Sequence, residues 1–147
     1  MMKKPQQPNN NPRFVQEIQA VSDLVGNGKY EEALKKIDEC EEKYPNDGNF
    51  QFNKVGLLID TGSGLKNADV VKRGLVIGEK HLQNGQYNKY RATTLYNLAN
   101  GYLCLFGLSE KDSGVEAIPQ SLNLQKAKTY FRQMLRLNNL NNDELRK

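Results

Sequence analysis

Apolar residues at helical spacing, set between two strong turn signals, constrain the fold of this chain more than any other feature. Ala33, Ile37 and Cys40 are spaced by four and then three residues, which places them on one stripe of an α-helix. The Gly-Asn-Gly turn at 26–28 precedes this stripe, and Pro45 follows it. The pattern predicts an amphipathic helix between the turn and the proline. Its small Ala33 lets a second helix approach closely.

The same spacing recurs along the chain and predicts six helices, at about 14–25, 29–44, 50–61, 67–83, 86–106 and 122–137. The glycines at 62 and 64 end the third helix. Residues 107–122 have the Ser, Asp, Gly and Pro content of a loop, and residues 138–142 are mostly asparagine, which breaks the pattern. We therefore predict an all-α fold with a disordered lead at 1–12. Residues 141–147 are predicted to be a C-terminal tail or the start of a truncated helix.

The second predicted helix and its flanking turns resemble the tetratricopeptide repeat, a helix-turn-helix unit of about 34 residues. The matching positions are Gly28, Tyr30, Ala33, Ile37, Cys40 and Pro45, with Ile and Cys in place of the family's usual aromatic and alanine. Leu95-x2-Leu98-Ala99-x2-Tyr102 resembles the family's first-helix signature, and Ala127-x3-Phe131 resembles its second helix. The resemblance implies a right-handed superhelix of antiparallel helix pairs, a solenoid that serves as a protein-binding scaffold. The alternative is an unrelated protein of helical hairpins that shares these spacings.

The register of the resemblance divides residues 13–140 into three repeat units, at about 13–46, 47–85 and 86–139. The middle unit lacks the small-residue signature, so its membership depends on its position in the series. Tyr102 and Ala127 are 25 residues apart. The family has about nine residues there, so the third unit has an insertion of about 16 residues between its helices.

In stacked helix pairs of this kind, the first helices line a concave surface. The packing positions of these helices are Leu24, Leu58 and Tyr102, and five residues before each lies a primary amide: Gln19, Asn53 and Asn97. An amide offers the donor and the acceptor that hold the backbone of an extended peptide. Asn97 also resembles the peptide-binding asparagine of many tetratricopeptide domains. Further contacts are expected from Phe52, Tyr96 and Asn100. The alternative is that these amides are ordinary exposed side chains in an asparagine-rich chain.

The net charge of +4 is mild, and most Lys and Arg residues alternate with acids, as on a solvated helix face. One local cluster contains Lys72, Arg73, Lys80 and His81. A second, spaced by two and four residues, can form one basic flank of the last helix: Lys126, Lys128, Arg132 and Arg136. No aromatic residues are interleaved as in nucleic-acid grooves, so we expect a solvated face and no nucleic-acid partner. The alternative function is a docking or sensor domain of a larger regulatory or nucleic-acid-associated protein that uses this flank.

Residue types for catalysis and metal binding are sparse. The chain has one histidine, His81, no nucleophile turn, and no Cys or His pair at metal-ligand spacing. Cys40 and Cys104 lie in apolar helical patterns, where we expect buried thiols without a disulfide. We therefore expect a non-catalytic protein without cofactor or metal that binds a protein or peptide partner.

The location and the oligomeric state are predicted from the apolar segments. No apolar run approaches the roughly 20 residues of a membrane-spanning helix, and residues 1–12 hold no apolar segment of a signal peptide. We expect a cytoplasmic protein without membrane contact. The last repeat unit is capped only by Leu137, Leu140 and Leu145, which favours a homodimer through this end.

Overall fold

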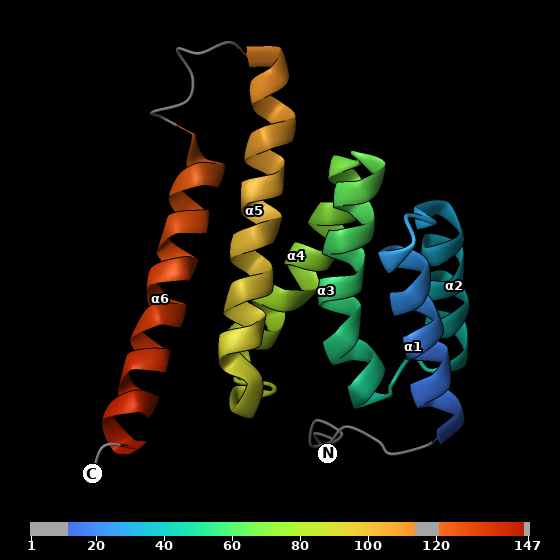
Figure 1. The fold of residues 1–147 in the computed structure, drawn as a ribbon, viewed down its shortest axis with the longest axis horizontal. Coiled ribbons are helices and arrows are strands. Elements are labelled where there is room, and N and C mark those ends of the chain that lie inside the picture. Colours follow the sequence, from blue (N-terminus) through green and yellow to red (C-terminus); the bar gives the residue numbers. More distant parts are fainter. Residues whose placement is uncertain (1–11, 114–120, 146–147) are drawn as a thin grey trace. The chain divides into compact units, whose positions relative to one another are not determined.

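A computed structural model describes residues 12–113 and 121–145 of the chain, and Figure 1 shows its ribbon. Within these residues every regular element is helical, which confirms the predicted all-α class. The elements are α1 (Pro12–Gly26), α2 (Tyr30–Lys43), α3 (Gly48–Leu65), α4 (Ala68–Gln83), the 3₁₀ turn η1 (Asn88–Tyr90), α5 (Arg91–Ser113) and α6 (Leu122–Leu145). The chain divides after Ile77 into two compact units. Residues 1–11 of the predicted lead lie outside the described part.

In the first unit, which ends at Ile77, α1 and α2 form a pair and α3 packs against both of them. The stripe predicted on α2 is confirmed, because its three residues are at most 3% exposed. Phe50 and Leu58 of α3 join this core and are also fully buried. The burial of apolar side chains from four helices stabilises the unit. The remaining buried members of the core are Val21, Leu57 and Val70.

The turn chemistry of the first unit has the physical basis that the sequence indicated. Gly28, between α1 and α2, has a φ of 74°, a backbone conformation that glycine adopts without a steric penalty. Asp47 caps α3, and its Oδ1 accepts a hydrogen bond from the Phe50 backbone N–H at 3.0 Å. The Asn67 Oδ1 accepts one from the Asp69 backbone N–H at 3.0 Å, at the start of α4. Each of these turns lies between two consecutive helices.

The third helix is predicted to end at Gly62 and Gly64. Instead, α3 continues through both glycines to Leu65. The reason is the close approach of the next helix. A Cβ on Gly62 would lie 2.6 Å from the Val71 backbone nitrogen, and one on Gly74 would lie 2.9 Å from the Val55 carbonyl oxygen. These glycines therefore act as contact points between α3 and α4, and not as helix breakers.

In the second unit, from Gly78 onward, α5 and α6 pack against each other in antiparallel directions. The rings of Tyr96 and Phe131 meet, and the Lys126 ammonium lies 4.9 Å from the centre of the Tyr102 ring, so the two helices run in opposite directions. The apolar residues of both matched signatures are buried, with the exception of half-buried Phe131: Leu95, Leu98, Ala99, Tyr102 and Ala127.

Three boundaries in the second unit differ from the prediction. The helix expected from residue 86 begins at Arg91, because left-handed backbone at Gly85 and Tyr87 and the turn η1 precede it. The loop expected at 107–122 is helical up to Ser113, and residues 114–120 lie outside the described part. The asparagine-rich 138–142 does not end α6, which continues to Leu145. Asparagine is only a moderately poor helix former, and α6 contains neither Gly nor Pro.

Candidate functional site

The predicted contact residues of the first unit lie on α1 and α3. Gln19 is exposed, and its Nε2 donates a hydrogen bond to Asp23 Oδ1 at 3.0 Å. Asn53 is half-buried, and its Nδ2 donates to the carbonyl oxygen and to Oδ1 of Asn49, at 2.8 and 2.9 Å. Phe52 is half-buried beside it. Both amides therefore already use their NH₂ groups within their own helices.

The predicted contact residues of the second unit lie on one side of α5. Tyr96 is 50% exposed, and its ring stands edge-to-face against Phe131 with 6.5 Å between centroids. Asn100 lies one turn further on and is half-buried. Asn97 is half-buried too, and its amide makes no hydrogen bond to another described residue. Among the three predicted amides, Asn97 thus has the donor and the acceptor that are open to a ligand.

A partly buried polar cluster, which the sequence did not predict, connects α4, α5 and α6 in the second unit. The Glu79 carboxylate accepts hydrogen bonds from the Tyr102 hydroxyl at 2.5 Å and the Tyr130 hydroxyl at 3.0 Å. The two phenol rings stack with 5.9 Å between centroids. The Lys126 Nζ donates to the Tyr102 hydroxyl at 3.5 Å. A signal existed in the sequence, because Glu79 follows Leu75 by four residues and so lies on the apolar stripe of α4.

The cluster changes the acidity of both phenols. Burial raises the pKa of Tyr130 to about 12, and the hydrogen bond to Glu79 acts in the same direction. The pKa of Tyr102 is raised as well, first by burial and then by its hydrogen bond to Glu79. A phenolate beside the carboxylate is unfavourable, so both tyrosines stay protonated as donors. The arrangement connects three helices through two hydrogen bonds to one carboxylate.

The four basic residues predicted as one flank of α6 lie on two different sides of this helix. Lys126 lies over the Tyr102 ring, on the side of α6 that faces α5. Lys128, Arg132 and Arg136 are exposed and follow each other at steps of four residues. Because each residue turns an α-helix by about 100°, Lys126 lies on a different side from Lys128. Lys126, although exposed, therefore does not share a face of α6 with the other three residues.

The other predicted basic cluster, on α4, is also not a common surface. His81 is 6% exposed, and its ring meets Tyr87 at 4.8 Å in an edge-to-face contact. Burial lowers the pKa of His81, since the charged imidazolium loses hydration there. Arg73 instead pairs with Asp38 at 3.0 Å. His81 and Arg73 therefore contact different neighbours and do not form one basic patch.

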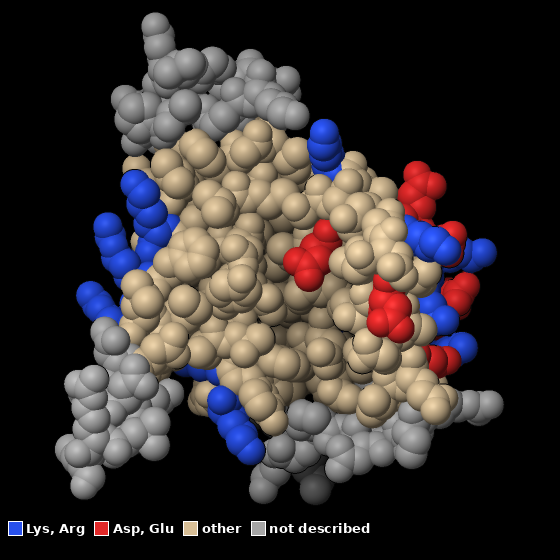
Figure 2. All heavy atoms as spheres, viewed as in Figure 1, with Lys and Arg blue, Asp and Glu red and all other residues tan. Residues whose placement is uncertain are grey.

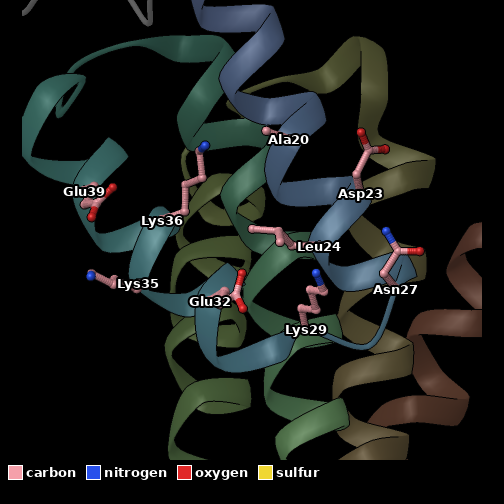
Figure 3. A pocket seen from close by; sticks show the side chains of 9 residues that line it. All are labelled: Ala20, Asp23, Leu24, Asn27, Lys29, Glu32, Lys35, Lys36 and Glu39. Atoms are coloured by element: carbon pink, nitrogen blue, oxygen red, sulfur yellow. The ribbon is translucent and has the colours of Figure 1, made fainter.

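A groove of about 500 Å³ lies between α1 and α2 of the first unit (Figure 3). Ala20 and Leu24 contribute its apolar part. Three lysines and three acidic residues surround it: Lys29, Lys35, Lys36, Asp23, Glu32 and Glu39. Because the charges balance, the groove favours neither an anionic nor a cationic ligand.

Both cysteines are free thiols. Cys40 is buried in the core of the first unit, and burial raises its pKa, so the reactive thiolate is disfavoured. Cys104 is half-buried on α5.

Comparison with protein-family models, curated proteins and solved structures gives no significant match to this chain. Among the side chains that the structure describes, no group of His, Cys, Asp and Glu is arranged to hold a metal ion. None of the helices in the described ranges is long and apolar enough to span a bilayer.

Proposed function

We propose that this chain is a non-catalytic interaction module that binds an extended peptide of a partner protein. In this proposal the helix pairs form a right-handed, tetratricopeptide-like superhelix, and the first helix of each pair contacts the peptide. The observation that carries the proposal is the side of α5 with Tyr96, Asn97 and Asn100. It combines an exposed aromatic ring with an amide that no described residue engages.

The packing of the first unit supports the fold proposed here. Successive antiparallel pairs require that the first helix of one pair contacts both helices of the preceding pair. The contacts of α3 with both α1 and α2 meet this requirement. Ala33 is completely buried, as expected for the small residue at which neighbouring helices come close.

The chemistry of the α5 residues suits a peptide backbone. The Asn97 amide can donate to a peptide carbonyl and accept from the next N–H, which gives a bidentate contact. The Tyr96 ring offers apolar area to a side chain and a hydroxyl at its edge. Asn53 has only its acceptor oxygen to offer, because its NH₂ group is bonded to Asn49. We therefore place the main contribution to affinity at Asn97.

The test is a peptide selected from a random display library on the immobilised full chain. We expect Asn97→Ala to weaken its binding about tenfold, the loss of one or two net hydrogen bonds. Asn53→Ala should weaken binding less, and the exposed amide variant Gln83→Ala serves as the matched control. Dissociation constants are measured by calorimetry. If every selected peptide binds the Asn97→Ala chain as tightly as the wild type, the proposal is wrong.

Two further predictions remain part of this proposal: the cytoplasmic location and the homodimer through the last helix pair. Of the three capping leucines, only the half-buried Leu137 has a described side chain. A docking function that uses the basic residues of α6 is the second candidate, and the exposure of three of them favours it.

A further inference from the structure

The outer side of α6 carries three exposed cations in a row. Lys128, Arg132 and Arg136 are each separated by four residues, so they lie on one face with about 6 Å of helix rise between neighbours. We call these three residues the basic stripe.

Among the side chains that the structure describes, none of the three cations of the basic stripe pairs with a carboxylate, whereas other cations of this chain do. In the first unit Lys43, Lys54 and Arg73 all lie within salt-bridge distance of a carboxylate. On the α5–α6 hairpin there is no Asp or Glu between 91 and 109 or between 121 and 138. Figure 2 shows Lys and Arg side chains along the edge of the visible face where α6 lies, without an acidic side chain beside them. Within the described ranges, the stripe is therefore a source of positive potential without an acidic side chain of either helix beside it.

An exposed apolar row lies beside the basic stripe, on the side toward α5. Leu135 is 54% exposed, Tyr96 is 50% exposed and Leu103 is 42% exposed. Phe131 connects the two helices through its contact with Tyr96. On the other side of the stripe lie the polar Gln125 and Thr129, with the exposed Leu122 beside them at the start of α6. Adjacent exposed tyrosine, leucine and arginine side chains are typical of protein interfaces.

We propose that the basic stripe and the apolar row together bind an acidic amphipathic helix of a partner protein. A helix with carboxylates at every fourth residue matches the spacing of the three cations. Its apolar face would then cover Leu135 and Leu103. A nucleic-acid strand offers phosphates but no apolar face for these leucines. A membrane surface would require a broad apolar face on α6, whereas the exposed residues Lys128, Arg132 and Arg136 separate the apolar row from Leu122.

The probe is a labelled synthetic peptide of about 20 residues, long enough to form a helix, with Glu at every fourth position beside a row of Leu. Its binding to the full chain is measured by fluorescence anisotropy. The double variant Arg132→Glu/Arg136→Glu should bind at least about tenfold more weakly, because attraction becomes repulsion. The control Lys72→Glu/Lys80→Glu, which makes the same change in net charge on α4, should change affinity by less than about twofold. Leu135→Ala should weaken binding without any change in charge.

A charge-swapped peptide, with Lys in place of each Glu, should bind the double variant and not the wild type. A scrambled acidic peptide of the same composition should bind the wild type at least about tenfold more weakly, because it cannot present a row of Glu beside a row of Leu on one helix. Equal binding of the scrambled peptide would overturn the proposal. The proposal would also be overturned if the helical peptide does not bind, but single-stranded oligouridine or vesicles with anionic lipid bind in a manner that depends on the basic stripe. All substituted residues are exposed, and circular dichroism verifies that each variant is folded.

Discussion

At the scale of single residues, Glu79 has the largest structural role that the chain's pattern of apolar residues did not predict. Its carboxylate is an acceptor for two phenols that come from α5 and α6. Hydrogen bonds to a charged acceptor are stronger than neutral ones, and a buried donor without its acceptor is costly. The second unit therefore depends on one carboxylate for the positions of three helices.

Replacing Glu79 by glutamine should lower the free energy of unfolding by about 1–3 kcal/mol, because both hydroxyls lose a charged acceptor. Urea unfolding near neutral pH measures this change. The exposed Glu42→Gln on α2 is the matched control, with little expected change. Equal stability of the Glu79→Gln chain and the wild type would show that the cluster does not stabilise the fold.

The same cluster predicts an alkaline transition of the wild type. The pKa of Tyr130 is about 12 in the folded chain against 10.0 for an ordinary tyrosine. Since the unfolded chain releases this proton more readily, stability is fully present below pH 10 and is lost as the pH rises toward 12. Glu79→Gln should lower the pKa of Tyr130 toward the ordinary value. Absorbance of the tyrosinate, followed with pH, measures both changes; a Tyr130 titration that is the same in both chains would contradict the assignment.

At the scale of helices, the contact between α3 and α4 in the first unit depends on glycine. Gly62 and Gly74 lie inside helices, where glycine is intrinsically unfavourable. Both are buried, and a Cβ on either would meet backbone atoms of the facing helix. Close approach of the two helices thus offsets the poor helix propensity of glycine.

Gly74→Ala should therefore destabilise the chain by about 1–3 kcal/mol, since the added methyl group meets Val55 and Ile59. Gly107→Ala is the matched control within α5, because a methyl group at that position would have no neighbouring atom within 4 Å. There the better helix propensity of alanine should stabilise by about 0.5–1 kcal/mol. Thermal unfolding of both variants measures the difference, and a stabilised Gly74→Ala chain would contradict the tight contact.

At the scale of the whole molecule, the surfaces of the two units differ in kind. The exposed charges of the first unit include both signs around the groove between α1 and α2. The second unit presents the uncompensated basic stripe and a row of exposed apolar side chains. In our proposals, the α5–α6 hairpin therefore has two adjacent binding surfaces. The surface at Asn97 binds the extended peptide, and the basic stripe binds the acidic helix.

These two surfaces meet at Tyr96, so variants should separate them. Asn97→Ala should weaken only the selected extended peptide, and Arg132→Glu/Arg136→Glu only the acidic helix. Tyr96→Ala should weaken both, by about threefold or more, since its exposed ring borders each surface. Titration of both probes against the three variants measures this pattern. If Asn97→Ala and the double variant affect both probes equally, the chain has one combined site.

The sequence by itself determined the all-α class, the approximate positions of the six helices and the buried stripe of Ala33, Ile37 and Cys40. These follow from helical periodicity and turn residues, which act within a few residues along the chain. Only the tertiary structure decided that α3 continues past Gly62, that Glu79 is the acceptor of two phenols, and that Lys126 lies over the Tyr102 ring. Each of these depends on atoms of another helix, and a local pattern does not specify which helix lies opposite.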